Sequence, residues 1–292
     1  MGAMLGAHSD CICPPESQFV IDVLRSWDQD GANLLTALNT IKSDWRFKLW
    51  ALDIDPTTVP ETKLGVSYPR LLEWIVARYA KNLGKTNARI WVDHTPRNMR
   101  YASTLLELFP QAKMIHIVRD GRGVASSVLP LDWGPNTIIK AALWWLAKIA
   151  HGLAVETLLE GHQIIRVKYE DLVCAPEETL RNLCAYLGIE YQAEMAQGGG
   201  FKPPRYTRGQ HTLIEKGPDV TRATRWETCL TPRQIEIFES LTHDFLRYLD
   251  YPLKYGLKAK IPTFREKRMA GIRGLSRSAM NKTRQYARRN SL

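Results

Sequence analysis

The sequence predicts an α/β fold built around a parallel sheet, and three observations carry this prediction. Short apolar runs alternate with helical patterns from Ala88 onward, which is the element order of βα units. Residues 114–118 show no polar alternation, as expected of a strand that is covered on both faces. Ordinary helix start and stop signals, such as Pro176 and Gly188, separate the apolar runs.

The elements are expected in a regular order along the chain. They are a strand at 89–92, a helix at 97–108, a strand at 114–118, a helix at 121–128, a long helix within 135–160, a strand at 163–167 and a helix from Pro176 to Gly188. The expected inner face of the long helix consists of Leu143, Trp144, Leu146, Ala147 and Ala150. Residues 27–87 fit the alternation less well and predict a helical insertion. A glycine-, proline- and arginine-rich loop is expected at 198–209.

Length and charge suggest one folded body with a basic tail. The chain has 292 residues, 45% of them apolar, and a net charge of +10. Residues 258–292 hold 11 Lys and Arg and one acid, Glu266, which leaves 29 basic and 29 acidic residues elsewhere. We therefore predict an α/β domain at 1–256, which includes the insertion, and a basic tail at 257–292.

Cysteine usage and hydropathy bear on metal binding and location. Five cysteines form no paired CxxC spacing, so neither a disulfide framework nor a zinc site is suggested, and no metal is expected. No run approaches about 18 uninterrupted apolar residues, and the first residues lack the features of a secretion signal. The expected location is the cytoplasm.

The stretch KMIHIVRDGRGVASSV, residues 113–128, contains the main candidate site. A strand that delivers Arg119 at its carboxyl end, followed by a helix that exposes Ser126 and Ser127, would form an anion site. Free N–H groups, the helix dipole and a guanidinium would converge there. A βα turn with two solvated arginines fits these residues equally well.

Neighbouring motifs favour the anion site. The string FPQAKMIHIVRDGRGVASSV is preceded by WVDHTPRN and followed by VKYEDLVCAPEETLRNLCAYLGI. Over residues 4–250 the sequence resembles the sulfotransferases that use 3′-phosphoadenosine 5′-phosphosulfate (PAPS), in particular the tyrosylprotein and related bacterial branches. The resemblance implies a P-loop-like three-layer sandwich with a parallel sheet. It also implies transfer of a sulfuryl group from PAPS, as co-substrate, to an acceptor hydroxyl.

The resemblance assigns nucleotide-binding residues. It implies that Arg119 and Ser127 hold the 3′-phosphate and that Tyr169 lies near the same nucleotide, although a packed tyrosine fits that position too. The string HTLIEKGPDVTRATRW is similar to a late loop over the nucleotide and nominates Lys216, Arg225 and Trp226. A solvated loop is the alternative there.

The resemblance also assigns two catalytic residues. MLGAHSDCICPPESQFV is similar to the family segment that follows the phosphosulfate loop, which places Glu16 at the general base. His94 stands where many relatives carry a lysine that steadies the leaving oxygen, and Asp93 beside it would favour the charged imidazole. A surface carboxylate and a structural histidine are the alternatives.

The sequence departs from the family at its start. No PRSGTT or GxxxxGK[ST] string is found, so the first strand and the phosphosulfate loop are expected to be missing, with residues 2–5 as the tail of the following helix. A chain beginning at Met1 is then expected to be poorly stable and inactive. An upstream start is favoured over a decayed relative.

Two other functions compete with sulfuryl transfer. One is a catalytically dead relative whose basic tail binds an anionic membrane or nucleic acid, although a plain solvated tail is favoured over such binding. The other is a nucleoside or nucleotide kinase, which would need a phosphate loop that the sequence lacks. The acceptor can be a sugar, a tyrosine, a lipid or a small alcohol, and the sequence sets no oligomeric state.

Overall fold

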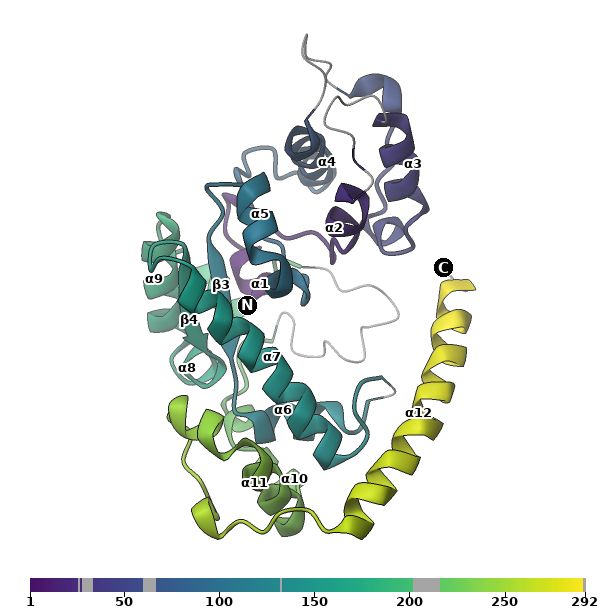
Figure 1. Cartoon of the computed structure of the whole chain (residues 1–292). Helices are drawn as coiled ribbons and strands as arrows, with labels where there is room; N and C mark the ends of the chain where they lie inside the picture. Colours follow the sequence, from purple (N-terminus) through teal and green to yellow (C-terminus); the bar gives the residue numbers. More distant parts are fainter. Residues whose placement is uncertain (26, 28–33, 60–66, 132, 202–215, 291–292) are drawn as a thin grey trace. The chain divides into compact units, whose positions relative to one another are not determined.

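The computed structural model describes residues 1–25, 27, 34–59, 67–131, 133–201 and 216–290 (Figure 1). The chain divides into two compact units, each made of two stretches of sequence. The first unit contains residues 1–114 and 176–218, and the second contains residues 115–175 and 219–292. The division into a domain at 1–256 and a tail at 257–292 stays a prediction. Most of the loop predicted at 198–209 lies outside the described residues.

The first unit is mainly helical and contains one short sheet. Its elements are α1 (Gly2–Leu5), β1 (Cys11–Ile12), α2 (Phe19–Leu24), α3 (Leu34–Ser43), η1 (Phe47–Trp50), η2 (Pro56–Thr58), α4 (Tyr68–Asn82), β2 (Ile90–Trp91), η3 (Asn98–Tyr101), α5 (Ala102–Leu108), α9 (Pro176–Leu187) and η4 (Ala193–Gln197). Strands β1 and β2 pair in parallel, with Cys11 opposite Ile90 and Ile12 opposite Trp91. The helical character predicted for 27–87 is found in its described part.

Helix α4 shows how the first unit builds its core. Pro69 stands in the first turn, where its missing N–H has no intrahelical partner to lose. Apolar side chains then recur at helical spacing and are buried: Tyr68, Leu71, Leu72, Ile75, Val76 and Tyr79. They join a cluster in which the Phe19 ring lies 5.3 Å from Phe47 and 5.6 Å from Trp50. Burial of this helix face supplies the apolar contact that holds the insertion to β1 and α2.

The second unit contains the remaining elements. They are β3 (Met114–Val118), α6 (Gly121–Val128), α7 (Ile138–Leu158), β4 (Ile164–Lys168), α8 (Tyr169–Cys174), η6 (Val220–Ala223), α10 (Trp226–Cys229), α11 (Pro232–Tyr248), η7 (Gly256–Lys258) and α12 (Phe264–Asn290). Strands β3 and β4 form a second two-stranded sheet. The predicted order of strands and helices from residue 88 to residue 188 is thus confirmed, as is the α/β class.

Helix α7 is the central helix of the second unit, and its inner face differs from the prediction. Ala141, Ala142, Trp145 and Ile149 are buried and belong to the core cluster with α6 and α11, whereas Leu143 is 53% exposed. The predicted face was wrong because the helix is apolar nearly all round, so hydropathy alone did not fix its rotation. By length and composition α7 could span a membrane, and in the second unit it packs against α6 and α11 with 39% of its apolar window buried.

Strand β3 is only partly covered. Val118 is fully buried, but Ile117, which points to the other face, is 42% exposed. The prediction that both faces of this strand are covered was therefore wrong at Ile117. An uninterrupted apolar run does not distinguish a strand buried on two faces from one with an open face.

Candidate functional site

The turn between β3 and α6 carries both arginines of the RDGR motif, and Arg122 has a structural role. Its side chain is fully buried and forms ion pairs with Asp120 at 2.7 Å and with Glu239 at 2.5 Å. The guanidinium also lies 3.9 Å from the centroid of the Trp226 ring. The alternative of two solvated arginines is therefore wrong for Arg122, because this side chain joins α6 to α10 and α11.

Arg119 has a different set of partners. It donates from Nη1 to Ser127 Oγ at 3.2 Å and from Nη2 to the Arg222 carbonyl oxygen at 3.0 Å. Its guanidinium carbon lies 4.3 Å from the centroid of the Tyr169 ring. Its Nε is buried and has no hydrogen-bond partner within the part of the chain that the structure describes. Arg119, Ser127 and Tyr169, which were selected from the sequence, are thus brought together.

The carboxylates near Arg119 are engaged with other groups. Asp120 accepts hydrogen bonds from Arg122, and Glu170 accepts from the Asp120 backbone N–H at 3.0 Å and from the Tyr251 hydroxyl at 3.0 Å. Neither carboxylate is therefore in an ion pair with Arg119. The guanidinium of Arg119 keeps hydrogen-bonding capacity for a negatively charged ligand.

The electrostatic environment of Arg119 also favours an anion. Burial lowers the pKa of Arg119, and the nearby charge of Arg222 lowers it further, while Tyr169 and Glu170 raise it. An arginine nevertheless stays charged at neutral pH. Removing a cation from water without an opposite charge is costly, and a bound oxyanion would offset that cost.

A four-residue spacing explains why Arg119 reaches Ser127. Gly123 and Ser127 are one helical turn apart, so they share a face of α6. A Cβ at Gly123 would lie 3.2 Å from Arg119 Nε, so the glycine leaves room for the guanidinium to lie across the helix. Ser127 Oγ also donates to the Gly123 carbonyl at 2.9 Å, which fixes the hydroxyl beside Arg119.

The first turn of α6 does not have the expected role. Asp120 is the N-cap residue, and its carboxylate accepts from the Arg122 N–H at 2.8 Å. The Arg122 N–H is therefore not free for the predicted convergence of N–H groups with the guanidinium, and the rest of that prediction stays a prediction. The candidate anion site consists of the side chains of Arg119, which precedes α6, and Ser127, near the end of α6.

The late loop contributes a residue that the sequence did not single out. Arg222, in η6, accepts the hydrogen bond from Arg119 through its carbonyl oxygen and places a second positive charge nearby. Arg225, the residue selected from the sequence, is exposed at the start of α10, and Trp226 packs against Arg122. Nothing in the sequence distinguishes Arg222 from Arg225, three residues later, as a nucleotide-binding residue. Lys216 is exposed in the first unit, and its predicted role stays a prediction.

In the first unit, parallel pairing brings the segments of Glu16 and His94 side by side. The carboxyl ends of β1 and β2 lie at the same edge, where Val92 N–H donates to the Ile12 carbonyl at 2.8 Å. One step further, Ser17 N–H donates to Thr95 Oγ1 at 2.8 Å. Both residues therefore follow strands at the edge of a sheet where parallel α/β folds place their ligands.

His94 is held by the segment that also carries Glu16. Its Nε2 lies 3.1 Å from the Pro14 carbonyl oxygen, and its ring lies 4.8 Å from the Phe201 ring in an edge-to-face arrangement. Because a carbonyl only accepts hydrogen bonds, Nε2 carries a proton and Nδ1 is the atom left for a further partner. The half-buried Glu16 accepts from Gln18 Nε2 at 2.9 Å.

Asp93, which was expected to act on His94, has hydrogen bonds to other residues. Its carboxylate accepts from the Ser17 hydroxyl and from the Thr95 backbone N–H. Asp93 therefore ties the segment after β1 to the segment after β2. This bridge fixes the backbone on both sides of Glu16 and His94.

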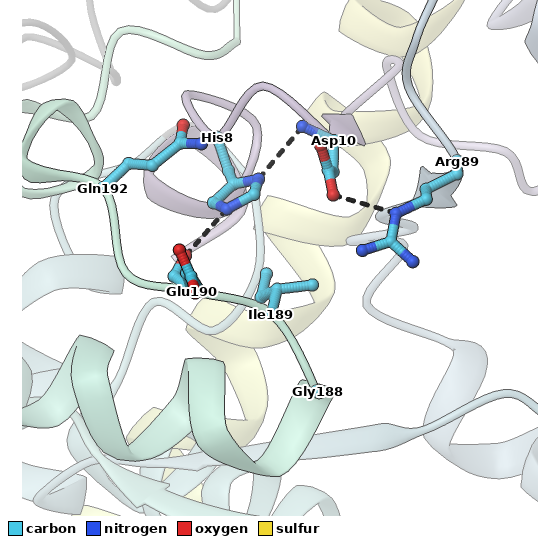
Figure 2. A pocket seen from close by; sticks show the side chains of 7 residues that line it. All are labelled: His8, Asp10, Arg89, Gly188, Ile189, Glu190 and Gln192. Carbon is cyan, nitrogen blue, oxygen red and sulfur yellow. Dashed lines mark hydrogen bonds and ion pairs between the residues drawn. The ribbon is translucent and has the colours of Figure 1, made fainter.

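A separate depression of about 510 Å³ lies in the first unit (Figure 2). It contains none of the residues selected from the sequence. His8 Nε2 lies 2.8 Å from the Glu190 carbonyl oxygen, and Asp10 and Arg89 form an ion pair at 2.8 Å. These polar groups form hydrogen bonds and an ion pair with one another. The depression therefore has the features of a contact between two surface segments. Among the described residues, no group of three or more His, Cys, Asp or Glu side chains is placed to hold a metal ion.

Comparison with known families gives a match over the first two thirds of the chain. A family model described as "Sulfotransferase family" matches residues 1–193. A protein-tyrosine sulfotransferase 1 from Danio rerio is 22% identical over 241 residues, which cover 77% of this chain and 61% of that protein. An omega-hydroxy-beta-dihydromenaquinone-9 sulfotransferase, Stf3, from Mycobacterium tuberculosis is 32% identical over 100 residues, which cover 29% of this chain and 25% of that protein.

One further relative and one solved structure also match, and the structure shows the fold. An uncharacterized protein from Aquifex aeolicus is 28% identical over 198 residues, covering 63% of this chain and 26% of that protein. The chain thus spans between a quarter and three fifths of the length of these three relatives. The sulfotransferase domain of the Synechococcus PCC 7002 olefin synthase superposes with a TM-score of 0.55 at 21% identity, covering 86% of this chain and 90% of that domain.

Proposed function

The chain belongs to the sulfotransferase family, and on this premise we propose that it transfers a sulfuryl group from PAPS to the hydroxyl of an acceptor. The observation that supports this proposal best is the geometry of Arg119. Its guanidinium is in contact with Ser127 and Tyr169, and among the described residues its buried Nε has no hydrogen-bond partner and no carboxylate forms an ion pair with it. These features suit the 3′-phosphate that distinguishes PAPS from ordinary adenine nucleotides.

In the proposed complex Arg119 and Ser127 bind the 3′-phosphate directly. The guanidinium supplies charge-assisted hydrogen bonds, each worth about 1.5–3 kcal/mol, and the Ser127 hydroxyl turns from the Gly123 carbonyl toward the phosphate. Arg222 adds a second positive charge. We propose Arg222 as a nucleotide-binding residue alongside Arg225 and Lys216.

Glu16 and His94 are the proposed catalytic residues. Sulfuryl transfer resembles phosphoryl transfer, in which positioning and electrostatic stabilisation provide most of the catalysis. Glu16 takes the proton from the acceptor hydroxyl, and His94 donates a hydrogen bond to the oxygen that leaves with the nucleotide. Because Nε2 of His94 faces the Pro14 carbonyl, that donor is Nδ1, which carries a proton alongside Nε2 only in the charged imidazole.

The acceptor proposed is a hydroxyl-bearing molecule. Among the relatives, some are named as protein-tyrosine sulfotransferases and one as a sulfotransferase of a hydroxylated menaquinone. A tyrosine peptide and a lipid alcohol are therefore the first two acceptors to test, ahead of a sugar or a small alcohol. Cytoplasmic location stays a proposal as well.

The test of this function uses sulfur-labelled PAPS with a tyrosine peptide and with a lipid alcohol. In a chain extended at its start by the family's first strand and phosphosulfate loop, we expect label to appear on one acceptor and Glu16→Gln to slow transfer by about 10²- to 10⁴-fold while nucleotide binding is kept. His94→Lys should extend activity to higher pH, because lysine stays charged there. If the folded, extended chain neither binds the nucleotide nor transfers the label, the proposal is contradicted.

A further inference from the structure

Helix α12 and the segment before it expose apolar side chains to an unusual degree. Within the described part of the chain, seven large apolar residues between 257 and 280 are exposed: Leu257, Ile261, Phe264, Met269, Ile272, Leu275 and Met280. Phe264 is 79% exposed and Leu275 is 76% exposed. Single exposed apolar residues are common on soluble proteins, but a continuous group of this size marks an interaction surface.

Small residues of α12 face the rest of the second unit. Ala270 is only 6% exposed, and a Cβ at Gly274 would collide with the Lys140 side chain of α7. The Arg273 carbonyl accepts a hydrogen bond from Asn136 Nδ2 at 2.8 Å. Ala270 and Gly274 are four residues apart, so they lie on one face of the helix. This face attaches α12 to α7.

The large apolar residues lie on the other half of the helix. Phe264 and Leu275 are separated by 11 residues, as are Met269 and Met280, and 11 residues make about three turns. Ile272 falls between these two rows. A soluble helix normally turns its large apolar side chains inward and its small or polar ones outward, and α12 does the reverse.

Three exposed arginines, Arg265, Arg268 and Arg273, are interleaved with these apolar residues on the same half of α12. The acid of the described helix, Glu266, is paired with Arg233 of α11 at 2.8 Å. The face therefore presents positive charge and apolar surface together. We define the α12 face as Phe264, Arg265, Arg268, Met269, Ile272, Arg273, Leu275 and Met280.

We propose that the α12 face binds the surface of an anionic lipid bilayer. Helices that lie in a membrane interface combine buried apolar side chains with cations that contact lipid headgroups, and the α12 face has both. Each cation near an anionic bilayer adds to binding, and the apolar side chains enter the boundary between headgroups and acyl chains. A nucleic-acid surface would use the arginines alone, because exposed apolar side chains gain nothing from a phosphate backbone.

The experiment measures binding of the full chain to phosphatidylcholine vesicles with and without phosphatidylserine by co-sedimentation. We expect binding to the vesicles that contain phosphatidylserine, which weakens as salt is added. Ile272→Ser and Leu275→Ser should each reduce the partition coefficient by about tenfold. Arg268→Gln and Arg273→Gln should each reduce it by about fivefold.

Matched controls come from exposed residues of the first unit. Leu35→Ser and Leu83→Ser remove apolar side chains that are 62% and 47% exposed, and Arg70→Gln and Lys81→Gln remove exposed charges from α4. These four variants should bind vesicles like the wild type. Circular dichroism checks that every variant keeps its helix content.

Two outcomes would overturn the proposal. In the first, the arginine variants lose binding while the Ile272 and Leu275 variants bind like the wild type. This result would indicate a purely electrostatic surface, such as one for nucleic acid. The other is absence of binding to phosphatidylserine vesicles at low salt. Neither outcome bears on sulfuryl transfer, because the α12 face shares no residue with the proposed nucleotide site.

Discussion

Arg119 and Arg122 leave the same turn three residues apart, and their surroundings assign them different roles. Arg122 is fully buried between Asp120 and Glu239, and further bonds to backbone groups complete this network. Arg119 is half-buried, and within the described segments it has no carboxylate partner and keeps a buried Nε without a hydrogen bond. A cation whose charge is balanced inside the protein stabilises the fold, whereas one left unbalanced indicates a ligand that the fold does not itself contain.

The largest expected effect is on the stability contributed by Arg122. Arg122→Ala leaves Asp120 and Glu239 without their counter-charge in the interior, which should lower the free energy of unfolding by about 3–5 kcal/mol. Urea denaturation followed by tryptophan fluorescence measures this change. A loss below about 1 kcal/mol would place Arg122 with the surface arginines and remove the contrast with Arg119.

The second prediction concerns the glycine beneath Arg119. Gly123→Ala should raise the free energy of unfolding by about 0.5–1 kcal/mol, because alanine favours the helix. The same Cβ would lie 3.2 Å from Arg119 Nε and push the guanidinium away from Ser127. We therefore expect adenosine 3′,5′-bisphosphate to bind about 2- to 10-fold more weakly. Unchanged affinity in calorimetry would mean that the Arg119 position does not matter for the ligand.

The third prediction is the stability of the Arg119→Ala variant without ligand. No ion pair with a described residue is lost, and removal of a partly desolvated cation offsets the lost contacts with Ser127, Arg222 and Tyr169, so the free energy of unfolding should stay within about 0.5 kcal/mol of wild type or rise. The same urea experiment applies. A loss as large as that in Arg122→Ala would show that Arg119 is a structural residue.

The smallest effect is expected at a half-buried ion pair near the surface, Arg233–Glu266. Hydrogen bonds from Arg233 lower the pKa of Glu266 to about 2. Because the folded-state pKa is depressed, the contribution is complete above the ordinary carboxyl pKa of about 4.3 and is lost as the pH falls toward about 2. Carboxyl NMR titration should show this midpoint, and Arg233→Ala should return it toward about 4.3. Equal midpoints in both proteins would contradict the pairing.

The sequence predicted the elements around the anion site well because their signals are local. An apolar run followed by arginine, aspartate and glycine specifies where β3 ends and α6 begins, and both were found at 114–118 and 121–128. The Arg119–Ser127 contact also follows from local spacing, since it lies within one turn and helix. Family resemblance was needed to connect these residues with a nucleotide.

Features that depend on distant parts of the chain escaped prediction. The structural role of Arg122 depends on Glu239, which is 117 residues away in sequence. The contact of Arg222 with Arg119 depends on how η6 packs against α8. The inner face of α7 depends on α6 and α11, because its own sequence is apolar on several sides. Such contacts are set by tertiary packing and leave no periodic signal in the sequence.

The central claim is that Arg119 recognises the 3′-phosphate, and a calorimetric cycle tests it most directly. Binding of adenosine 3′,5′-bisphosphate and of adenosine 5′-monophosphate is measured for the wild type and for Arg119→Ala. We predict that the wild type prefers the bisphosphate by about 10- to 100-fold, as one charge-assisted contact allows, and that the variant loses this preference while its affinity for the monophosphate is kept. An equal preference in both proteins would contradict the claim.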